Sequence, residues 1–277
     1  MRYSPSTARN VRVGFSTPTY PGVGPVPIIL ERTAAICDIL AAVMELSSVL
    51  ATPAAWAIAA INVVYFLIAQ SQGNTTQAET LIRFGALDRV RIWKEGESWR
   101  LVTACFLHVG WMHLFWNTYA MFGWCQHVEE ELGTVQFILA YLMTGIGASA
   151  VSVLGHRAVS AGASGAGFGM IGVALMIAYR NLGGWHEFFS NPSVLYILRT
   201  TAIWFVLGLF AIRMDNFAHA GGFVFGLLAG YAMSLSPEHS KGLRLPVLLG
   251  VLAIWIAVVL ASLSPRFARK PRESDPP

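Results

Sequence analysis

Seven long apolar stretches, each close to the length needed to cross a bilayer, constrain this chain more than any other feature. A helix needs about 20 residues to span the hydrocarbon core, where the backbone must pair its own N–H and C=O groups. Only 12% of the residues are charged, whereas about 25% is typical of soluble proteins. We therefore predict an all-α, polytopic membrane helical bundle. The predicted spans are residues 49–69, 103–124, 132–154, 164–179, 193–212, 216–235 and 245–263.

An amphipathic segment precedes the first span. Within residues 28–50, the acidic residues Glu31, Asp38 and Glu45 are each seven positions apart. Seven residues make two helical turns, so the three carboxylates share one face, which is typical of a helix lying at the membrane interface. We divide the chain into an N-terminal tail with this interfacial helix (1–48), a six-span core (49–235) and a seventh span with a basic tail (236–277).

Charge limits the partners that we expect. The formal net charge is +4, with no long basic block, so nucleic acid is not an expected partner. Membrane lipid and other membrane proteins remain as the expected partners. The distribution of Lys and Arg does not settle the orientation of the spans, because the positive-inside rule mildly opposes a cytoplasmic N-terminus.

A few polar side chains lie inside the predicted spans. They are His108, His113, Asn117, Ser164 and His219. Polar groups in the hydrocarbon core cost free energy unless they are paired or line a wet cavity, so they mark a functional site by default. His113 and Asn117 are four residues apart and share one helical face.

Ser164 lies in a run of residues with very small side chains, Ala161 to Gly169. A serine between glycines at a sharp turn into a helix would have an uncovered hydroxyl beside unpaired backbone N–H groups. That arrangement suits a nucleophile with an oxyanion site. An alternative is close helix packing, because Ala161, Gly165 and Gly169 recur at every fourth position.

The sixth span also has a small-residue face. Gly222, Gly226 and Gly230 follow His219 at helical spacing, and the glycine-rich start of the fourth span is a natural partner for that face. If the two faces meet, Ser164 and His219 become neighbours.

Such neighbours would provide the elements of nucleophilic catalysis. His219 could take the proton of Ser164, and the amide of Ser164 with His113 and Asn117 could hold an oxyanion. Asp215, one turn before His219, is better explained as the cap of the sixth span than as a third catalytic member.

In order and spacing, these residues resemble the rhomboid intramembrane serine proteases. The matching segments are Gly96-Glu97-Ser98-Trp99-Arg100, Thr103, Phe106, His108, His113, Asn117, Gly162-Ala163-Ser164-Gly165, Ala218-His219-Ala220-Gly221-Gly222 and Gly226. The resemblance covers about residues 50 to 235. It implies a Ser164–His219 dyad, with His113 and Asn117 supporting the oxyanion.

The resemblance also implies roles for residues around the dyad. His108 would be structural, and Trp99 and Arg100 would belong to a first loop that dips into the membrane. Gly162 belongs to the motif around the serine. Phe168 stands where some relatives have a tyrosine that stacks on the catalytic histidine. His127, His156, His186 and His239 lie in or near connections and receive no role.

Topology and substrates follow from the same resemblance. It implies a six-helix core with one extra C-terminal transmembrane helix, a cytoplasmic N-terminus and an active site opening to the extracytoplasmic side. Substrates would be single-span transmembrane proteins, and no cofactor or metal is needed. We expect a bacterial plasma membrane. The oligomeric state remains open.

Two other classes of function remain to be weighed. The first is a non-proteolytic member of the fold that binds membrane clients, although such relatives typically lose the serine or the histidine. The second is a haem or metal protein. His113 and His127 would stand at opposite ends of one helix, and the HExxH motif is absent, so metal chemistry is not supported.

Overall fold

The computed structural model describes residues 47, 49–156, 158–210, 214–234 and 244–264. The chain divides into two compact units, Met1–Ser47 and Ser48–Pro277, and the helices given below belong to the second. The predicted interfacial helix at residues 28–50 lies almost entirely outside the described residues. The described helices are α2 (Pro53–Ser71), α3 (Ala78–Arg83), α4 (Arg89–Lys94), α5 (Arg100–Thr103), α6 (Gly110–Leu132), α7 (Thr134–Gly155), α8 (Ser164–Leu182), α9 (Trp185–Ser190), α10 (Pro192–Phe210), α11 (Asn216–Ser234) and α13 (Arg244–Ser262).

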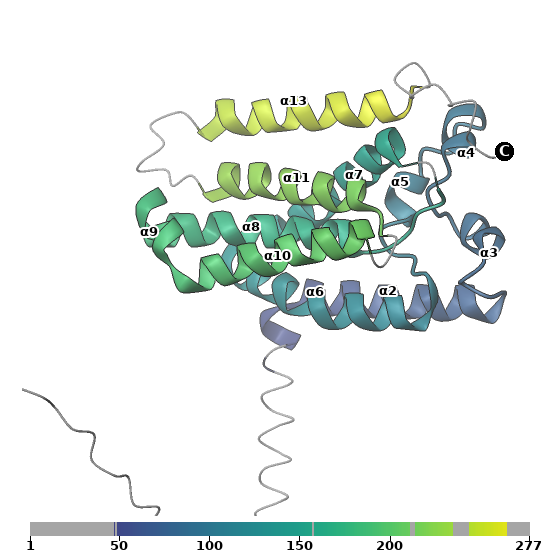
Figure 1. Cartoon of the computed structure of the whole chain (residues 1–277), viewed down its shortest axis with the longest axis horizontal. Helices are drawn as coiled ribbons and strands as arrows, with labels where there is room; N and C mark the ends of the chain where they lie inside the picture. Colours follow the sequence, from purple (N-terminus) through teal and green to yellow (C-terminus); the bar gives the residue numbers. More distant parts are fainter. Residues whose placement is uncertain (1–46, 48, 157, 211–213, 235–243, 265–277) are drawn as a thin grey trace, which may run out of the picture. The chain divides into compact units, whose positions relative to one another are not determined.

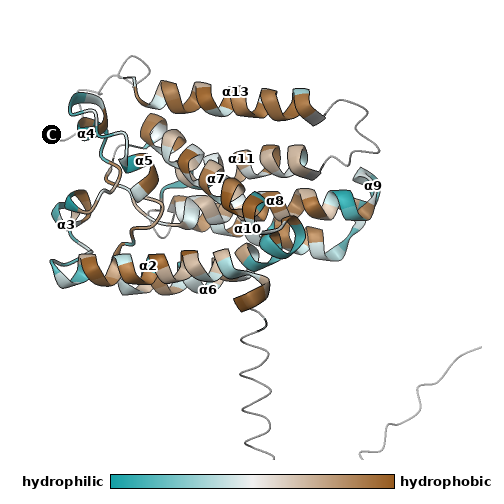
Figure 2. Ribbon diagram, turned by 180° about the vertical axis from the view of Figure 1, so that it is seen from behind, coloured by the Kyte–Doolittle hydropathy of each residue, from teal (hydrophilic) through white to brown (hydrophobic). Residues whose placement is uncertain are grey.

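The described chain is a helical bundle, and the predicted fold class is confirmed (Figure 1). Five of its helices are long and apolar enough to cross a membrane, namely α2, α7, α8, α10 and α13. The other two long helices of the described part are α6, which contains His113 and Asn117, and α11, which contains His219. Figure 2 shows hydrophobic residues along α7 and α13 and hydrophilic ones at α3 and α9. The chain is an integral, multi-pass membrane protein.

The second span begins later than predicted. We expected it to start at Thr103, but the helix α5 ends there, residues 104–109 are not helical, and α6 begins at Gly110. Gly110 has a φ of +72°, a conformation that glycine adopts without steric cost. His108 therefore lies in the connection before α6 and not within a span.

The second span also ends later than predicted, because α6 continues past residue 124 to Leu132. Residues 129–131 belong to the last turn of this helix, and Gly133, with a φ of +82°, follows it. Glu129 is buried there because other helices supply its hydrogen-bond donors. Its carboxylate accepts from the backbone N–H groups of Ala54 (3.1 Å) and Ala55 (2.7 Å) at the start of α2. The hydroxyl of Thr134, at the start of α7, also donates to it (2.8 Å).

Helix α8 packs against α11 with almost no side chains between the two backbones. A Cβ atom at Gly222 would overlap the carbonyl oxygen of Gly165, and one at Gly226 would overlap that of Gly169. The glycine face of α11 thus meets the start of α8, as the sequence predicts. This contact lets two helices approach at backbone distance, which larger residues would prevent.

The C-terminal helix α13 is joined to the rest of the described unit by tryptophan hydrogen bonds. Trp255 of α13 donates its indole N–H to the carbonyl of Met143 in α7 (2.7 Å). Trp93 of α4 donates to the carbonyl of Ser262 at the end of α13 (2.7 Å). The helix therefore contacts both a membrane span and the polar connection between α2 and α6.

Candidate active site

Ser164 is the first residue of α8, directly after a tight turn of the chain. Gly162 has a φ of +149°, and its N–H donates to the carbonyl of Ala104 (2.9 Å). A Cβ atom at Gly162 would lie 2.7 Å from Cε1 of His113. Glycine is required here because the backbone both turns and passes beside a ring. The turn leaves the Ser164 hydroxyl at the start of the helix, beside N–H groups that lack helical partners.

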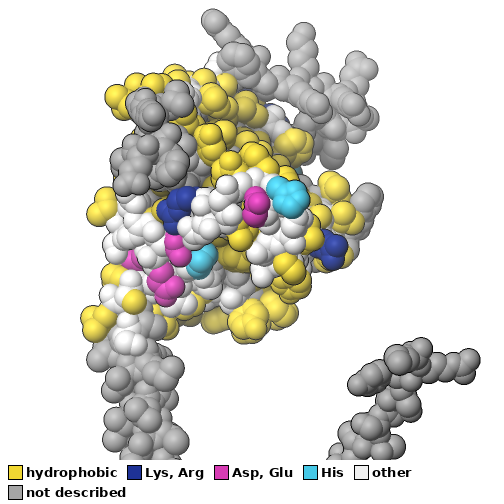
Figure 3. Space-filling view, turned by 90° about the vertical axis from the view of Figure 1, so that its left-hand side faces the viewer, with side chains coloured by type: hydrophobic (Ala, Val, Ile, Leu, Met, Phe, Trp, Pro, Cys, Tyr) yellow, Lys and Arg dark blue, Asp and Glu magenta, His cyan; other side chains and the backbone are white. Residues whose placement is uncertain are grey.

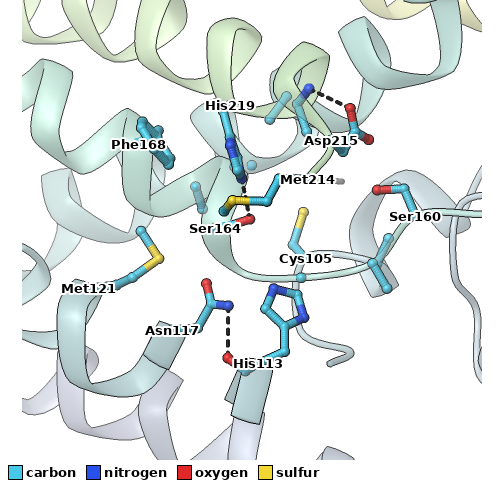
Figure 4. Close-up of a pocket in the computed structure, with 18 of the residues that line it drawn as sticks. Cys105, His113, Asn117, Met121, Ser160, Ser164, Phe168, Met214, Asp215 and His219 are labelled. Carbon is cyan, nitrogen blue, oxygen red and sulfur yellow. Dashed lines mark hydrogen bonds between the residues drawn. The ribbon is translucent and has the colours of Figure 1, made fainter. Parts of the chain in front are cut away.

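The hydroxyl of Ser164 and the ring of His219 face each other across the α8–α11 contact (Figure 4). Ser164 Oγ and His219 Nε2 are 2.9 Å apart. Nε2 accepts the hydroxyl proton when Nδ1 carries the ring proton. Within the described residues, Nδ1 of His219 has no hydrogen-bond partner. This is the geometry that a serine nucleophile and a histidine base require.

An aromatic ring fixes the orientation of His219. Phe168, one turn after Ser164 on α8, stacks on the imidazole with ring centroids 4.3 Å apart and planes inclined by 20°. Phe205 of α10 packs in turn on Phe168, at 5.1 Å between centroids. His219 is therefore held by packing rather than by a carboxylate.

Asp215 caps α11, and among the described residues its carboxylate makes no hydrogen bond to the His219 ring. One carboxylate oxygen accepts from the N–H of Ala218 (3.0 Å), and the other accepts from the hydroxyl of Ser152. The backbone carbonyl of Asp215 accepts from the N–H of His219 (3.1 Å). The sequence prediction of a capping aspartate agrees with these contacts.

His113 and Asn117 lie on α6, on the other side of Ser164 from His219 (Figure 4). Nδ1 of His113 accepts from the N–H of Val109 (3.2 Å), so Nε2 carries the ring proton and can donate. The Asn117 amide donates to the carbonyl of His113 (2.9 Å). This bond uses one of its two N–H groups and leaves the second for another acceptor.

These side chains line one cavity of about 710 Å³. It includes Ser164, His219, His113, Asn117, Gly162 and Phe168, and most of its other lining residues are apolar. Sequence reasoning gave no role to His156, which also lines the cavity, and it treated Asp215 only as a cap. No local pattern identifies His156, whereas the position of Asp215 one turn before His219 is a local signal for its place beside the site.

The remaining predicted residues lie outside this cavity. His108 is fully buried and hydrogen-bonds through Nδ1 to the carbonyl of Phe106 (3.2 Å). Its ring stands edge-on to His113, 5.5 Å between centroids. His108 is thus placed to support His113 rather than to meet a substrate.

Arg100 begins α5 and Trp99 directly precedes it, in the connection between α2 and α6. Trp99 is half exposed, whereas Arg100 is buried and binds Glu97 (2.5 Å) and the carbonyl of Ile82 (2.7 Å). The guanidinium also lies over the Trp99 ring at 4.7 Å. Arg100 therefore organises the connection, and the structure does not bring either residue to Ser164.

Comparison with known proteins supports one family. The family model described as "Rhomboid domain" matches residues 95–236. The rhomboid protease GluP of Bacillus subtilis (strain 168) is 35% identical over 199 residues, which cover 72% of this chain and 38% of that protein. RHOMBOID-like protein 5 of Arabidopsis thaliana is 37% identical over 167 residues, covering 58% of this chain and 52% of that protein.

Another plant relative is named as lacking activity. Inactive RHOMBOID-like protein 8 of Arabidopsis thaliana is 34% identical over 149 residues, which cover 53% of this chain and 41% of that protein. The chain thus spans between 38% and 52% of the length of these relatives. Since they come from a bacterium and a plant, the bacterial origin of the chain stays a prediction. The matched domain covers about half of the chain and contains Ser164, His219, His113 and Asn117, so the chain belongs to the rhomboid family.

Proposed function

We propose that this chain is an intramembrane serine endopeptidase that hydrolyses peptide bonds in or near the transmembrane segments of other membrane proteins. The observation that carries the proposal is the 2.9 Å separation of Ser164 Oγ and His219 Nε2 inside a cavity of about 710 Å³. A partly buried serine and a buried histidine among membrane helices cost free energy. Acyl transfer is the chemistry that their arrangement suits.

The proposed reaction has two stages. His219 Nε2 takes the hydroxyl proton of Ser164 as Oγ attacks the scissile carbonyl carbon. The resulting imidazolium then gives this proton to the leaving amine, which breaks the peptide bond and leaves an acyl-enzyme. In the second stage, a water molecule gives its proton to His219, attacks the acyl carbon and releases the carboxylic acid product, and the serine recovers its proton.

Three donors are available for the oxyanion that forms in each stage. The N–H of Ser164 lies at the start of α8, where the helix dipole favours negative charge. His113 offers Nε2–H, because its Nδ1 is already an acceptor for Val109. Asn117 offers its second amide N–H. Donors held in place before the charge develops stabilise it more than the same groups in bulk water.

Substrate and topology complete the proposal. The substrates would be single-span membrane proteins that reach the cavity from the lipid. The N-terminus would be cytoplasmic and the active site would open to the extracytoplasmic side. The six helices from α2 to α11 that are long enough to span would form the catalytic core, and α13 would be an added helix. The proposal also keeps the division of the chain into an N-terminal segment (1–48), the catalytic core (49–235) and a C-terminal segment (236–277).

The test compares variants of the purified protein in detergent with a fluorogenic peptide that contains one transmembrane segment. Ser164→Ala and His219→Ala are expected to lose cleavage. Ser190→Ala and His186→Ala are matched controls on α9, where both residues are exposed and lie outside the cavity. These controls should cleave like the wild type.

Two results would overturn the proposal. Cleavage by Ser164→Ala at the wild-type rate would show that the serine is not the nucleophile. If the wild type neither cleaves nor is labelled at Ser164 by a fluorophosphonate, a client-binding protein without peptidase activity becomes the better explanation. A relative with the word "inactive" in its name makes this second outcome a necessary part of the test.

A further inference from the structure

The two ends of the catalytic cavity differ in chemistry. Figure 4 shows Met121 and Phe168 on one side of the Ser164–His219 pair, and Asp215 and Ser160 on the other. Of the described residues that line this cavity, Asp215 alone carries a formal charge when histidines are neutral. A peptide crossing Ser164 would therefore place one flank of the scissile bond at an apolar end and the other near a carboxylate.

The charge of Asp215 is not balanced by a described cation. Its carboxylate accepts hydrogen bonds from the N–H of Ala218 and the hydroxyl of Ser152, which are both neutral groups. No Lys or Arg of the described chain forms an ion pair with it. A carboxylate offers about four acceptor positions, so these two bonds leave room for a further donor. Asp215 is only partly buried, which keeps it accessible from the cavity.

Capping alone does not require a charge at this position. Asparagine caps helices about as well as aspartate, and its side-chain oxygen could equally accept from Ala218. The negative charge is thus an additional property of the cavity. In partly buried surroundings, where the effective dielectric is far below that of water, it attracts a cation and repels an anion more strongly than a surface carboxylate does.

We propose that Asp215 makes this protein prefer substrates with a Lys or Arg beside the scissile bond, on the flank that reaches the Asp215 end of the cavity, and disfavour Asp or Glu there. This preference rests on the proposed peptidase function. The preferred Lys or Arg would lie at the interfacial end of the substrate's transmembrane segment, where a basic side chain is tolerated. Asp215 acts on binding of the flanking residue, and takes no part in the proton transfers of Ser164 and His219.

The experiment uses a set of otherwise identical single-span peptides. Each of the three positions on either side of the cleaved bond carries Lys, Gln or Glu in turn. We measure kcat/KM for the wild type and Asp215→Asn at about pH 8, where ordinary histidines are neutral. At one or two neighbouring positions on one flank, the wild type should prefer Lys to Glu by roughly tenfold or more. In Asp215→Asn this Lys-to-Glu ratio should fall to about one.

Asp88→Asn is the matched control. Asp88 also caps a helix, accepting from the N–H of Val90 (2.8 Å) at the start of α4, and it does not line the cavity. For Asp88→Asn, the ratio of kcat/KM between the Lys and Glu peptides should equal that of the wild type. Asp215→Ser, a neutral residue that can also cap, provides a second variant if Asp215→Asn is poorly folded.

The outcomes separate the two proposals. If the wild type cleaves the peptides with equal kcat/KM for Lys and Glu at all positions, the charge preference is wrong while the peptidase function stands. An unchanged ratio in folded Asp215→Asn would also overturn it. If the wild type cleaves no peptide of the set and is not labelled by a fluorophosphonate, the peptidase function itself fails.

Discussion

The ring of His113 occupies the space in which Gly162 would carry a side chain. A Cβ atom at Gly162 would lie 2.7 Å from His113 Cε1 and 3.2 Å from Nε2. The turn before Ser164 and the orientation of the proposed oxyanion donor are therefore determined by the same contact. Neither residue can change its position without moving the other.

Gly162→Ala should consequently reduce cleavage by at least tenfold. The new methyl group displaces His113, and the positive φ of residue 162 adds backbone strain of about 1–3 kcal/mol. Gly133→Ala is the control, because Gly133 also has a positive φ (+82°) but nothing lies within 4 Å of an added Cβ. The control should lower the melting temperature in detergent and leave kcat/KM of the folded protein unchanged. Equal activity of Gly162→Ala and wild type would contradict this role of the glycine.

Gly222→Ala should separate α8 from α11. The added Cβ would overlap the backbone carbonyl of Gly165, which cannot rotate away as a side chain can. A displacement of about 1 Å at reacting groups can cost on the order of a hundredfold in rate. We expect a loss of this size in kcat/KM, together with a lower melting temperature. Gly123→Ala in α6, where an added Cβ has nothing within 4 Å, should keep the wild-type kcat/KM and melting temperature. Wild-type values for Gly222→Ala would contradict the prediction.

Phe168→Tyr should retain activity within a few-fold, because the ring that stacks on His219 is kept. Phe168→Leu removes the stacked ring and should lower kcat/KM by about tenfold, since an aromatic contact contributes about 0.5–1.5 kcal/mol beyond its buried area. Phe188→Leu, at a buried phenylalanine of α9 away from the cavity, controls for lost packing. A similar kcat/KM for the two leucine variants would show that stacking on His219 is unimportant.

Glu129→Ala should destabilise the protein without impairing its chemistry. The carboxylate accepts hydrogen bonds from Ala54, Ala55 and Thr134, and its loss leaves buried N–H groups unpaired at a cost of about 3 kcal/mol. Thermal unfolding in detergent measures this effect, and kcat per folded molecule should stay near the wild-type value. Glu130→Ala, at the exposed neighbour, should unfold at the wild-type temperature. If Glu130→Ala lowered the unfolding temperature as much as Glu129→Ala does, the destabilisation would be due to the change in surface charge.

Much of the helical arrangement is predictable from the sequence because its signals are local. Runs of apolar residues give the long helices, and the spacing of Gly222 and Gly226 after His219 gives the face that meets α8. The proximity of Ser164 and His219 then follows from that contact, since each residue begins or nearly begins its helix. The chemical roles of these residues remain a proposal.

The start of α6 is not predictable in the same way. Residues 104–109 are mostly apolar, so hydropathy does not distinguish them from the helix that follows. The end of α6 at Leu132, beyond the predicted residue 124, is unpredictable for the opposite reason. A carboxylate in a membrane protein suggests a polar turn, and only the start of α2, far away in sequence, supplies the donors that allow its burial. The position of His156 in the cavity likewise depends on contacts between distant segments.

The glycine contact between α8 and α11 has a mechanical consequence. Most helix interfaces absorb a small displacement by changing side-chain rotamers, but at Gly165, Gly169, Gly222 and Gly226 there are no side chains to change. The two backbones can only slide or tilt as rigid bodies. A tilt that a thinner or thicker bilayer imposes on one helix would therefore change the spacing of the two backbones that carry Ser164 and His219.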